Sequence, residues 1–590
     1  MHVANSRLTS SLLFRADKIS MSSGTSTAPS TSSVPVSSTD MSSVTSALSD
    51  VATSLSPDEL TKKVEEIKAA GNERFLKGDY TQAKALYTDA LSLNPNIVAI
   101  YSNRALCELK LEQYGLAIAD ATKAIELDAT FAKAYYRRAS AHLSILDPKA
   151  ALPDLKMVMK LDPRNVQVKM QLDATSKLVR RLEFEKAIRV EEGPAPHQTV
   201  EEFLEQNMGG AQIPSDYKGP RLPTHASNEP ISAPVDNKPY LGQIDDAFID
   251  QMIQHFKEGK QLPNGIAWAI ILGALRAFEK EASLVEYTVP EGTTIEVVGD
   301  THGQFYDFVH LLSLTGRPSK NHALLFNGDF VDRGSWSVEI ALTIFAFKWL
   351  YPATTLVNRG NHETSDMNKV YGFEGECKAK FGGDMTFKLF TQTFVAIPLA
   401  TVVNVSRPPL PADKLPENAS KSQAQKAPVV CKETGFKRYF VVHGGLFSDD
   451  HVTLDDIRAI DRFSKKQPGQ EGLMMELLWS DPQAASGRGP SKRGVGFSFG
   501  PDITRAWCEL NGITAVLRSH EVRQRGYAEE HDGMCCTVFS APNYCDSTGN
   551  SGAFGHIDDQ GTLSWTMFEA QPHPDIRPMA YAGGMGGLLA

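Results

Sequence analysis

The chain has no long apolar segment and no paired cysteine motif. Its longest apolar run, Gly265 to Leu275, is about half of the ~20 residues that a membrane-spanning helix needs. The seven cysteines are irregularly spaced, odd in number and without a CxxC pair. We therefore interpret them as reduced thiols of a cytoplasmic or nuclear protein and expect no membrane partner.

The chain also lacks a basic excess. It has 60 Lys and Arg residues and 70 Asp and Glu residues, which gives a net charge of -10. Nucleic-acid-binding proteins usually carry clustered positive charge, so we expect no nucleic-acid partner. With 590 residues, the chain is too long for a single hydrophobic core, and two or more domains are expected.

Four stretches have the composition of segments without a core. Residues 1–57 are rich in Ser and Thr with almost no aromatic side chains, which predicts a disordered tail. Residues 191–240 are rich in Pro and Gly and are interpreted as a linker. A Pro- and Lys-rich insertion is expected at about 404–430, and residues 583–590 form a Gly-rich tail.

An internal repeat follows the N-terminal tail. Gly71, Ala105 and Ala139 are separated by steps of thirty-four residues, as are Leu93 and Leu127. Small residues at this period are the signature of tetratricopeptide repeats, in which paired helices approach closely. We expect an all-α domain over 58–190, with repeats at 64–97, 98–131 and 132–165 and a capping helix after them.

Three short segments carry the chemistry. GDTHGQF begins at Gly299, GDFVDRG at Gly328 and RGNHE at Arg359, and together they hold Asp, His and Asn side chains next to glycines. Carboxylate, amide and imidazole ligands suit Mg, Mn, Fe or Zn. Two such ions can clamp the attacking and leaving oxygens of a phosphoryl displacement, so these segments indicate phosphate-ester hydrolysis.

Each of these segments follows an apolar run that is typical of a buried strand, as does HGGLF at His443. Together with SKRGV at Ser491, RSHE at Arg518 and SAPNYCD at Ser540, the motifs resemble the PPP family of serine/threonine protein phosphatases. The repeats in front are similar to those of the type 5 branch of that family. The resemblance implies an α/β metallophosphoesterase domain over 241–582, calcineurin-like, with a central β-sandwich flanked by helices.

The same resemblance implies a ligand set for two divalent ions. One ion is expected on Asp300, His302 and Asp329. The other is expected on Asn361, His443 and His520, with Asp329 bridging the two. The ligands tolerate Mn, Fe, Zn and Mg, and manganese is the ion we expect in vitro.

Catalytic roles follow from the resemblance as well. A hydroxide activated by the two ions is the implied nucleophile. Arg333 and Arg493 are expected to hold phosphate oxygens, and His362, oriented by Asp332, is expected to protonate the leaving oxygen. Asn361 is expected to face the substrate, and Tyr544 to lie at the rim of the pocket. The implied substrates are phosphoserine and phosphothreonine in proteins.

The repeats also carry a candidate peptide site. Five polar residues lie on the first helices of the three repeats: Lys68, Asn72, Asn103, Lys133 and Arg137. They are similar to the two-carboxylate clamp that takes the acidic C-terminal tail of cytosolic heat-shock chaperones. The alternative is an ordinary solvated basic face.

Family resemblance further suggests that the repeats cover the catalytic mouth, with Glu112 approaching its cationic pocket. The four glycines after PMAYA disfavour a C-terminal helix, so we expect this inhibition to be looser here. Two rivals remain: a metallophosphoesterase acting on nucleotides or nucleic acid, and a repeat scaffold or co-chaperone with weak activity. A dead scaffold predicts a missing ligand or arginine, and none is missing.

Overall fold

The computed structural model describes residues 56–187, 194–206, 213, 216–223, 243–408, 429–431 and 435–582. Nearly all of the predicted N-terminal tail, most of the predicted insertion and the Gly-rich C-terminal tail lie outside these residues; Pro57, the last residue of the predicted tail, begins the first helix. A helical region comes first and an α/β region follows, which confirms the predicted fold class. Among the described helices, none is both long and apolar enough to cross a membrane.

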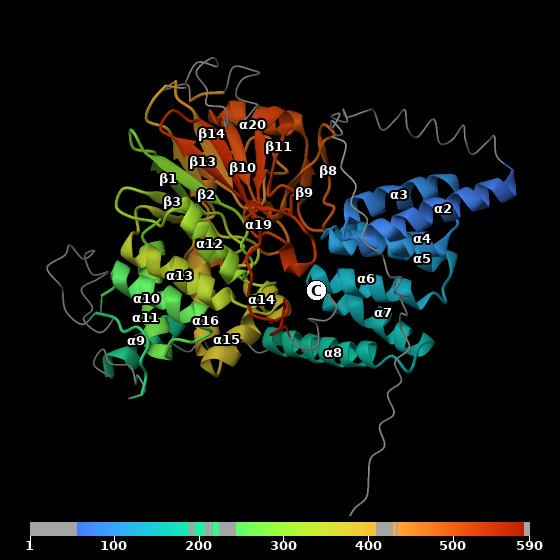
Figure 1. Ribbon diagram of the computed structural model, residues 1–590, viewed down its shortest axis with the longest axis horizontal. Coiled ribbons are helices and arrows are strands. Elements are labelled where there is room, and N and C mark those ends of the chain that lie inside the picture. The colour runs from blue at the N-terminus through green and yellow to red at the C-terminus, as the bar shows by residue number, and fades with distance from the viewer. Residues whose placement is uncertain are drawn as a thin grey trace, which may run out of the picture. The chain divides into compact units, whose positions relative to one another are not determined.

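The helical region is a stack of antiparallel helix pairs (Figure 1). Alanines at the helix contacts, such as Ala83, Ala117 and Ala151, are fully buried. At Gly71 an added Cβ would lie 2.7 Å from the ring of Tyr87, so only glycine allows these two helices to pack so closely. The helices are α2 (Pro57–Leu76), α3 (Tyr80–Leu93), α4 (Val98–Lys110), α5 (Tyr114–Leu127), α6 (Ala132–Ser144), α7 (Pro148–Leu161) and α8 (Val166–Ala187).

The segment predicted as a linker contains a packed helix. Helix α9 (Pro196–Gln206) buries Val200 and Leu204, one turn apart, in the same core as the helices of the α/β region. The backbone N–H of His197 donates to Oε1 of Gln392, 3.0 Å away. The Pro-rich composition of 191–240 hid this short amphipathic helix.

Within the described residues the α/β region has two main sheets and a small third one. The six-stranded sheet has the order β1 (Leu284–Thr288), β5 (Ala400–Asn404), β6 (Arg438–Val442), β10 (Ala515–Arg518), β12 (Cys535–Val538) and β11 (Tyr527–Glu530). The five-stranded sheet has the order β14 (Leu563–Phe568), β13 (Gly552–Asp558), β2 (Thr294–Val298), β3 (Ala323–Phe326) and β4 (Thr355–Val357). The third sheet joins β7 (Asp481–Pro482), β9 (Phe497–Phe499) and β8 (Arg488–Pro490).

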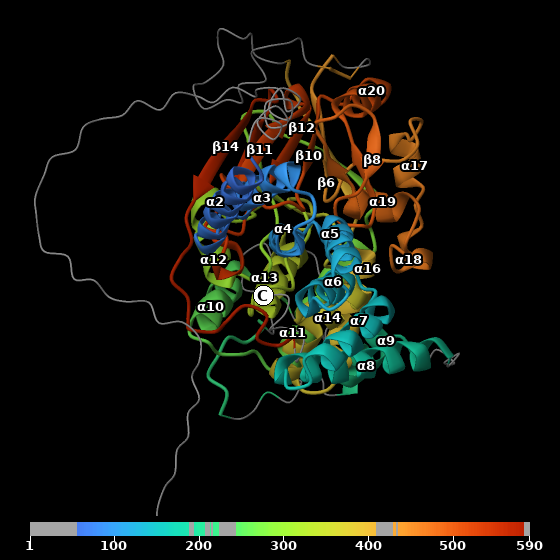
Figure 2. The same ribbon diagram turned by 90° about the vertical axis from the view of Figure 1, so that its right-hand side faces the viewer.

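The two main sheets pack face to face. Val297 and Leu325 of one sheet share a core with Val403, Val441 and Leu517 of the other. The outer face of the five-stranded sheet is covered by α10 (Asp246–Lys257), α11 (Asn264–Phe278), α12 (Phe305–Thr315), α13 (Ser337–Leu350), α15 (Phe373–Phe381) and α16 (Met385–Ala396). The outer face of the other sheet is covered by α17 (Leu454–Arg458), α19 (Leu473–Trp479) and α20 (Pro501–Asn511), as Figure 2 shows. The short helices α14 (Ser365–Tyr371) and α18 (Arg462–Lys465) complete the region.

Candidate active site

The six predicted metal ligands all follow the carboxyl ends of strands. β2, β3 and β4 are parallel neighbours, and so are β6 and β10, so their following loops meet at one edge of the sandwich. β2 leads to Asp300 and His302, β3 to Asp329, and β4 to Asn361. The strands β6 and β10 lead to the remaining predicted ligands, His443 and His520. All six side chains are buried.

The loops hold their functional residues in a strained backbone conformation. His302, Asp329, Arg333 and His520 have φ values of 40°, 48°, 68° and 72°. Such a conformation costs a non-glycine residue on the order of 1–3 kcal/mol and persists only where the surroundings impose it. The strain therefore marks these loops as shaped for a function.

Glu363 supplies part of that constraint. Its buried carboxylate accepts hydrogen bonds from the backbone N–H groups of Asp329, Phe330 and Gly360, at 2.8, 3.0 and 2.8 Å. It thereby joins the loop after β3 to the loop after β4. This role of Glu363, the last residue of the RGNHE motif, was not predicted, because nothing in the sequence shows where its carboxylate lies.

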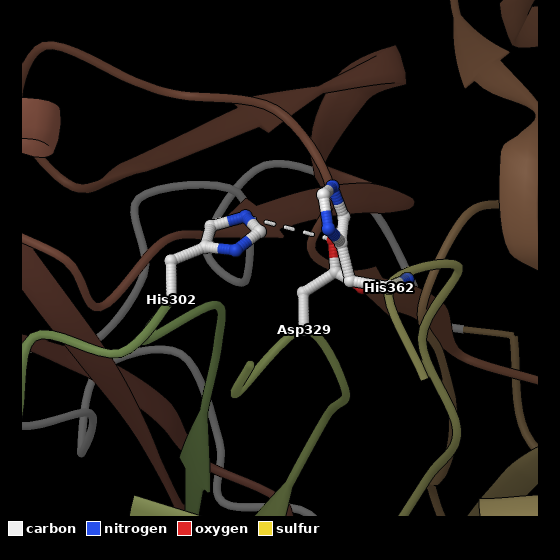
Figure 3. A group of neighbouring side chains, drawn as sticks. All are labelled: His302, Asp329 and His362. Carbon is white, nitrogen blue, oxygen red and sulfur yellow. Dashed lines mark hydrogen bonds and ion pairs between the residues drawn. The ribbon is translucent and has the colours of Figure 1, made fainter. Parts of the chain in front are cut away.

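The unprotonated ring nitrogens of two histidines, His302 and His443, lie close to carboxylate oxygens. Nδ1 of His302 lies 3.1 Å from the carbonyl oxygen of Val331, and a carbonyl can only accept, so Nδ1 carries the proton. The bare Nε2 then faces Asp329 (Figure 3) and lies 3.6 Å from its Oδ2. The same Nε2 lies 3.8 Å from Oδ2 of Asp300. His443 is arranged alike: Nδ1 donates to the carbonyl of Asn327 at 2.9 Å, and Nε2 lies 3.3 Å from Oδ2 of Asp329.

Asp329 is common to two groups of potential metal ligands. One group is Asp329 with His302 and His362, the other is Asp329 with His443 and His520, and the ligand atoms of each group lie within 4.8 Å of one another. In the first group we expected Asp300 and not His362, for which we predicted a role in proton transfer. Asp300 lies in the same place, because its two oxygens are each 3.8 Å from a ring nitrogen of His302 or His443.

The donor set fits divalent cations. Oδ1 of Asn361 lies 2.8 Å from the bare Nε2 of His443, and Oδ2 of Asp300 is buried without a hydrogen-bond partner among the residues that the structure describes. If the amide oxygen and nitrogen of Asn361 were exchanged, the amide N–H₂ would donate to Nε2 of His443. The bare Nε2 of His302 would still face the carboxylates of Asp300 and Asp329 without a proton between them. Burial raises the pKa of Asp300 and Asp329 well above their usual range and lowers that of His302. Bound cations would lower the pKa of the two carboxyl groups again and would keep the imidazole neutral, as a metal ligand must be.

His362 and Asp332 form a buried pair. Nδ1 of His362 lies 2.9 Å from Oδ2 of Asp332. The same carboxylate accepts from Nδ2 of Asn368 at 2.8 Å and from the N–H of Phe373 at 2.9 Å. Asp332 is thus fixed on all sides, and it leaves Nε2 as the ring nitrogen of His362 that can meet a substrate.

The two predicted phosphate-binding arginines are held by residues that the sequence analysis did not single out. Nε of Arg493 donates to Asp481 at 2.8 Å, and its NH2 donates to the carbonyl of His520 at 2.6 Å. The guanidinium of Arg333 lies 4.1 Å above the ring centre of Tyr371. Both supporting residues are buried, and no local sequence signal points to them.

A carboxylate from the helical region occupies the space between these arginines. Oε1 of Glu112 lies 2.7 Å from NH2 of Arg333, and Oε2 lies 3.2 Å from NH1 of Arg493. The Tyr544 hydroxyl also donates to Oε1, at 3.2 Å. Although burial opposes ionisation, the two arginines lower the pKa of Glu112 to about 2. Glu112 is therefore a bound anion in the site.

The predicted peptide-binding residues lie on α2, α4 and α6. Oδ1 of Asn72 accepts from the Tyr87 hydroxyl at 2.7 Å and from Nδ2 of Asn103 at 3.2 Å, which leaves the Asn72 amide N–H₂ as a donor. Lys133 and Arg137 line a cavity of about 290 Å³. Burial lowers the pKa of Arg137 to about 10, and none of its described hydrogen bonds or ion pairs is with a carboxylate. Lys68 pairs with Glu65 at 2.7 Å.

Comparisons with known proteins agree with this geometry. The calcineurin-like phosphoesterase family matches residues 293–524, the PPP5 TPR repeat region matches 172–286, and the tetratricopeptide repeat matches 69–97 and 98–131.

Among curated relatives, serine/threonine-protein phosphatase T of Aspergillus oryzae is 48% identical over 516 residues, which cover 88% of this chain and 96% of that protein. Serine/threonine-protein phosphatase 5 of Homo sapiens is 40% identical over 526 residues, which cover 89% and 94%. A solved Saccharomyces cerevisiae protein serine/threonine phosphatase with similarity to human phosphatase PP5 is 44% identical, with a TM-score of 0.50, and covers 57% of this chain and 100% of its own. The chain belongs to the type 5 family of serine/threonine protein phosphatases, in which tetratricopeptide repeats precede a calcineurin-like metallophosphoesterase domain.

Proposed function

We propose that this phosphatase hydrolyses phosphoserine and phosphothreonine at the buried edge of the sandwich, and that its repeats both inhibit the site and receive an acidic peptide. The observation that carries the proposal is the convergence of Arg333 and Arg493 on one carboxylate, next to the ligand groups that share Asp329. A phosphate monoester is also an oxyanion and would take the place of that carboxylate.

Six residues would hold two divalent cations: Asp300, His302, Asp329, Asn361, His443 and His520. When bound, the cations would lower the pKa of a shared water and offset the charge of the phosphate. Mn, Fe, Zn and Mg all accept these ligands, and we propose Mn for the enzyme in vitro.

The remaining residues bind and orient the ester. Arg333 and Arg493 hold its equatorial oxygens, Asn361 faces it from the loop after β4, and the Tyr544 hydroxyl donates from the rim. His362 gives a proton to the leaving Ser or Thr oxygen from Nε2, while Asp332 holds Nδ1 and keeps the ring in place.

The role of His362 has a leaving-group test. An alkoxide from phosphoserine needs a proton more than the phenolate of an aryl phosphate does. We expect His362→Asn to lower kcat for a phosphoserine peptide by about 10²–10⁴-fold and to affect an activated aryl phosphate much less. Metal content of the variant is the control, and an equal loss on both substrates would contradict the role.

Glu112 acts as an internal inhibitor in this proposal. It sits on both phosphate-binding arginines and reaches them from the turn between α4 and α5, so substrate and Glu112 compete for one place. An acidic C-terminal tail of a cytosolic heat-shock chaperone would bind Lys68, Asn72, Asn103, Lys133 and Arg137 and favour the open form.

The reduced state of the cysteines supports a cytoplasmic and nuclear location, and the described part of the chain holds no disulfide. The alternative, a repeat scaffold or co-chaperone with weak activity, has no specific observation in its favour, because the ligand groups, the histidine–aspartate pair and both arginines are in place. Metal-dependent release of phosphate from a phosphoserine peptide, with dinucleotides as rival substrates, separates the candidate activities.

A further inference from the structure

The segment that follows β14 crosses the loop that carries Arg333. We call residues 571–582 the C-terminal strap. The backbone N–H of Met579 donates to the carbonyl oxygen of Arg333, 2.8 Å away. Two residues on, the Ser335 hydroxyl donates to the carbonyl of Arg577 at 2.8 Å and accepts from the N–H of Ala580 at 3.3 Å. Three hydrogen bonds therefore tie the strap to the phosphate-binding loop.

That loop needs an external support. Asp332 and Arg333 have φ values of 67° and 68°, in the left-handed region that side chains other than glycine avoid. The N–H of Arg333 lies 3.4 Å from the carbonyl of Tyr371, a long hydrogen bond. The bond from Met579 to the Arg333 carbonyl is shorter and fixes the peptide plane that follows this strained residue.

The other end of the strap is anchored beside a second substrate-facing loop. The N–H of Gln571 donates to Oδ1 of Asp307 at 2.6 Å. Nε2 of His573 lies 3.1 Å from Oδ1 of Asp546, which belongs to the 3₁₀ turn η6 (Tyr544–Asp546). The ring of His573 also packs edge-on against Trp336, with the ring centres 5.3 Å apart. The strap thus joins the loop of Arg333 to the turn of Tyr544.

The side chain of Met579 reinforces the same arrangement. It is 1% exposed and lies in one apolar cluster with Met367, Val370 and Tyr371. Tyr371 is the residue whose ring lies under the Arg333 guanidinium. The strap therefore contacts the backbone of Arg333 directly and its guanidinium through Tyr371.

From these contacts we propose that the C-terminal strap is a positioning element for the phosphate site, with Met579 and Ser335 as the residues through which it sets the orientation of Arg333. The inference rests on the proposed function, in which Arg333 binds phosphate. A positioning element and an inhibitory lid have opposite effects on turnover: removing the strap should lower turnover, whereas removing a lid would raise it.

The test uses the full chain with metal added, in a Glu112→Gln background so that release of inhibition cannot mask a loss. Three variants are compared: Ser335→Ala, a chain ending at Pro574, and a chain ending at Ala582. The last is the matched control, because it retains every strap contact described above. The readouts are kcat/KM on a phosphoserine peptide and the inhibition constant of inorganic phosphate, with metal content and thermal melting as checks of the fold.

We expect the chain ending at Pro574 to lose about tenfold or more in kcat/KM, and the phosphate inhibition constant to rise, while metal content stays at the control value. Ser335→Ala should move both quantities in the same direction by a smaller factor, and Ser335→Thr, which keeps the hydroxyl, should recover part of the loss. An unchanged phosphate inhibition constant, or a gain in kcat/KM, in a folded chain ending at Pro574 would overturn the inference. An inactive parent chain would instead overturn the proposed function itself.

Discussion

Glu112 and Arg333 form an ion pair, with 2.7 Å between Oε1 and NH2, although 220 residues lie between them in the chain; the Arg333 side chain is buried and that of Glu112 is 17% exposed. A buried charge that loses its partner destabilises the arrangement by about 3–5 kcal/mol. Glu112→Gln should therefore shift the protein towards the open form and raise turnover of a small aryl phosphate by about tenfold or more.

The matched control for that variant is Glu126→Gln. Glu126 lies on α5, is exposed, and within the described residues forms its ion pair with the exposed Lys123 at 3.1 Å. Its neutralisation should leave turnover unchanged. Equal rates for Glu112→Gln and the unmodified chain would mean that this contact does not limit access to the site.

Gly115 allows a test that leaves every charged group in place. Its N–H donates to the carbonyl of Lys492 at 2.9 Å, and an added Cβ would lie 2.8 Å from the backbone nitrogen of Gly494. Gly115→Val should force the α4–α5 turn away from the loop that carries Arg493. We expect turnover to rise as for Glu112→Gln, and Gly115→Ala to have a smaller effect. If Gly115→Val has normal helix content but the turnover of the unmodified chain, close packing at this glycine does not hold the site shut.

If the peptide site binds carboxylates, removing a positive charge from it should lower its affinity for an acidic peptide. Arg137→Ala removes a half-buried guanidinium from the cavity that it shares with Lys133. Hydrogen bonds to charged groups contribute about 1.5–3 kcal/mol. Affinity for an acidic peptide with a free α-carboxylate should fall by roughly tenfold to a hundredfold in calorimetry. Lys156→Ala, an exposed change on α7, is the control. Unchanged affinity in Arg137→Ala would place the peptide elsewhere.

His573 predicts a pH dependence of stability. Although partial burial opposes protonation, hydrogen bonds to the Pro574 carbonyl and to Asp546 raise the pKa of His573, and Asp307 adds to this. A raised folded pKa stabilises the folded state below the unfolded pKa of about 6.5, and this contribution disappears as pH rises through the folded value. The free energy of unfolding of the unmodified chain should exceed that of His573→Gln at about pH 6, with the difference shrinking at higher pH. A difference that grows with pH would contradict this contact.

The sequence predicted those features that depend on residues close together in the chain. The repeat period follows from packing at positions such as Gly71 and Ala105, and the metal loops follow from short motifs that begin where strands end. Both features depend on residues that are close in the sequence, so they can be recognised before the fold is known. The predicted ligand Asp329 lies among the histidines expected beside it.

The supporting residues were not predictable in the same way. Asp481, Tyr371 and Glu363 act through contacts with Arg493, Arg333 and the β3 loop, and these contacts exist only after distant loops meet. The helix at 196–206 was missed for another reason: its two buried residues, Val200 and Leu204, are too few to stand out in a Pro-rich segment. Long-range partners and short amphipathic helices are the features that composition hides.

The central claim is that two divalent cations, held by six side chains with Asp329 shared, make this chain a phosphomonoesterase. It is tested most directly by elemental analysis of the purified, active protein combined with phosphate release from a phosphoserine peptide before and after chelation. The account predicts two ions per chain, loss of turnover on chelation, recovery when manganese is restored, and neither metal pairing nor turnover in Asp329→Asn. Turnover that persists after the metals are removed would contradict it.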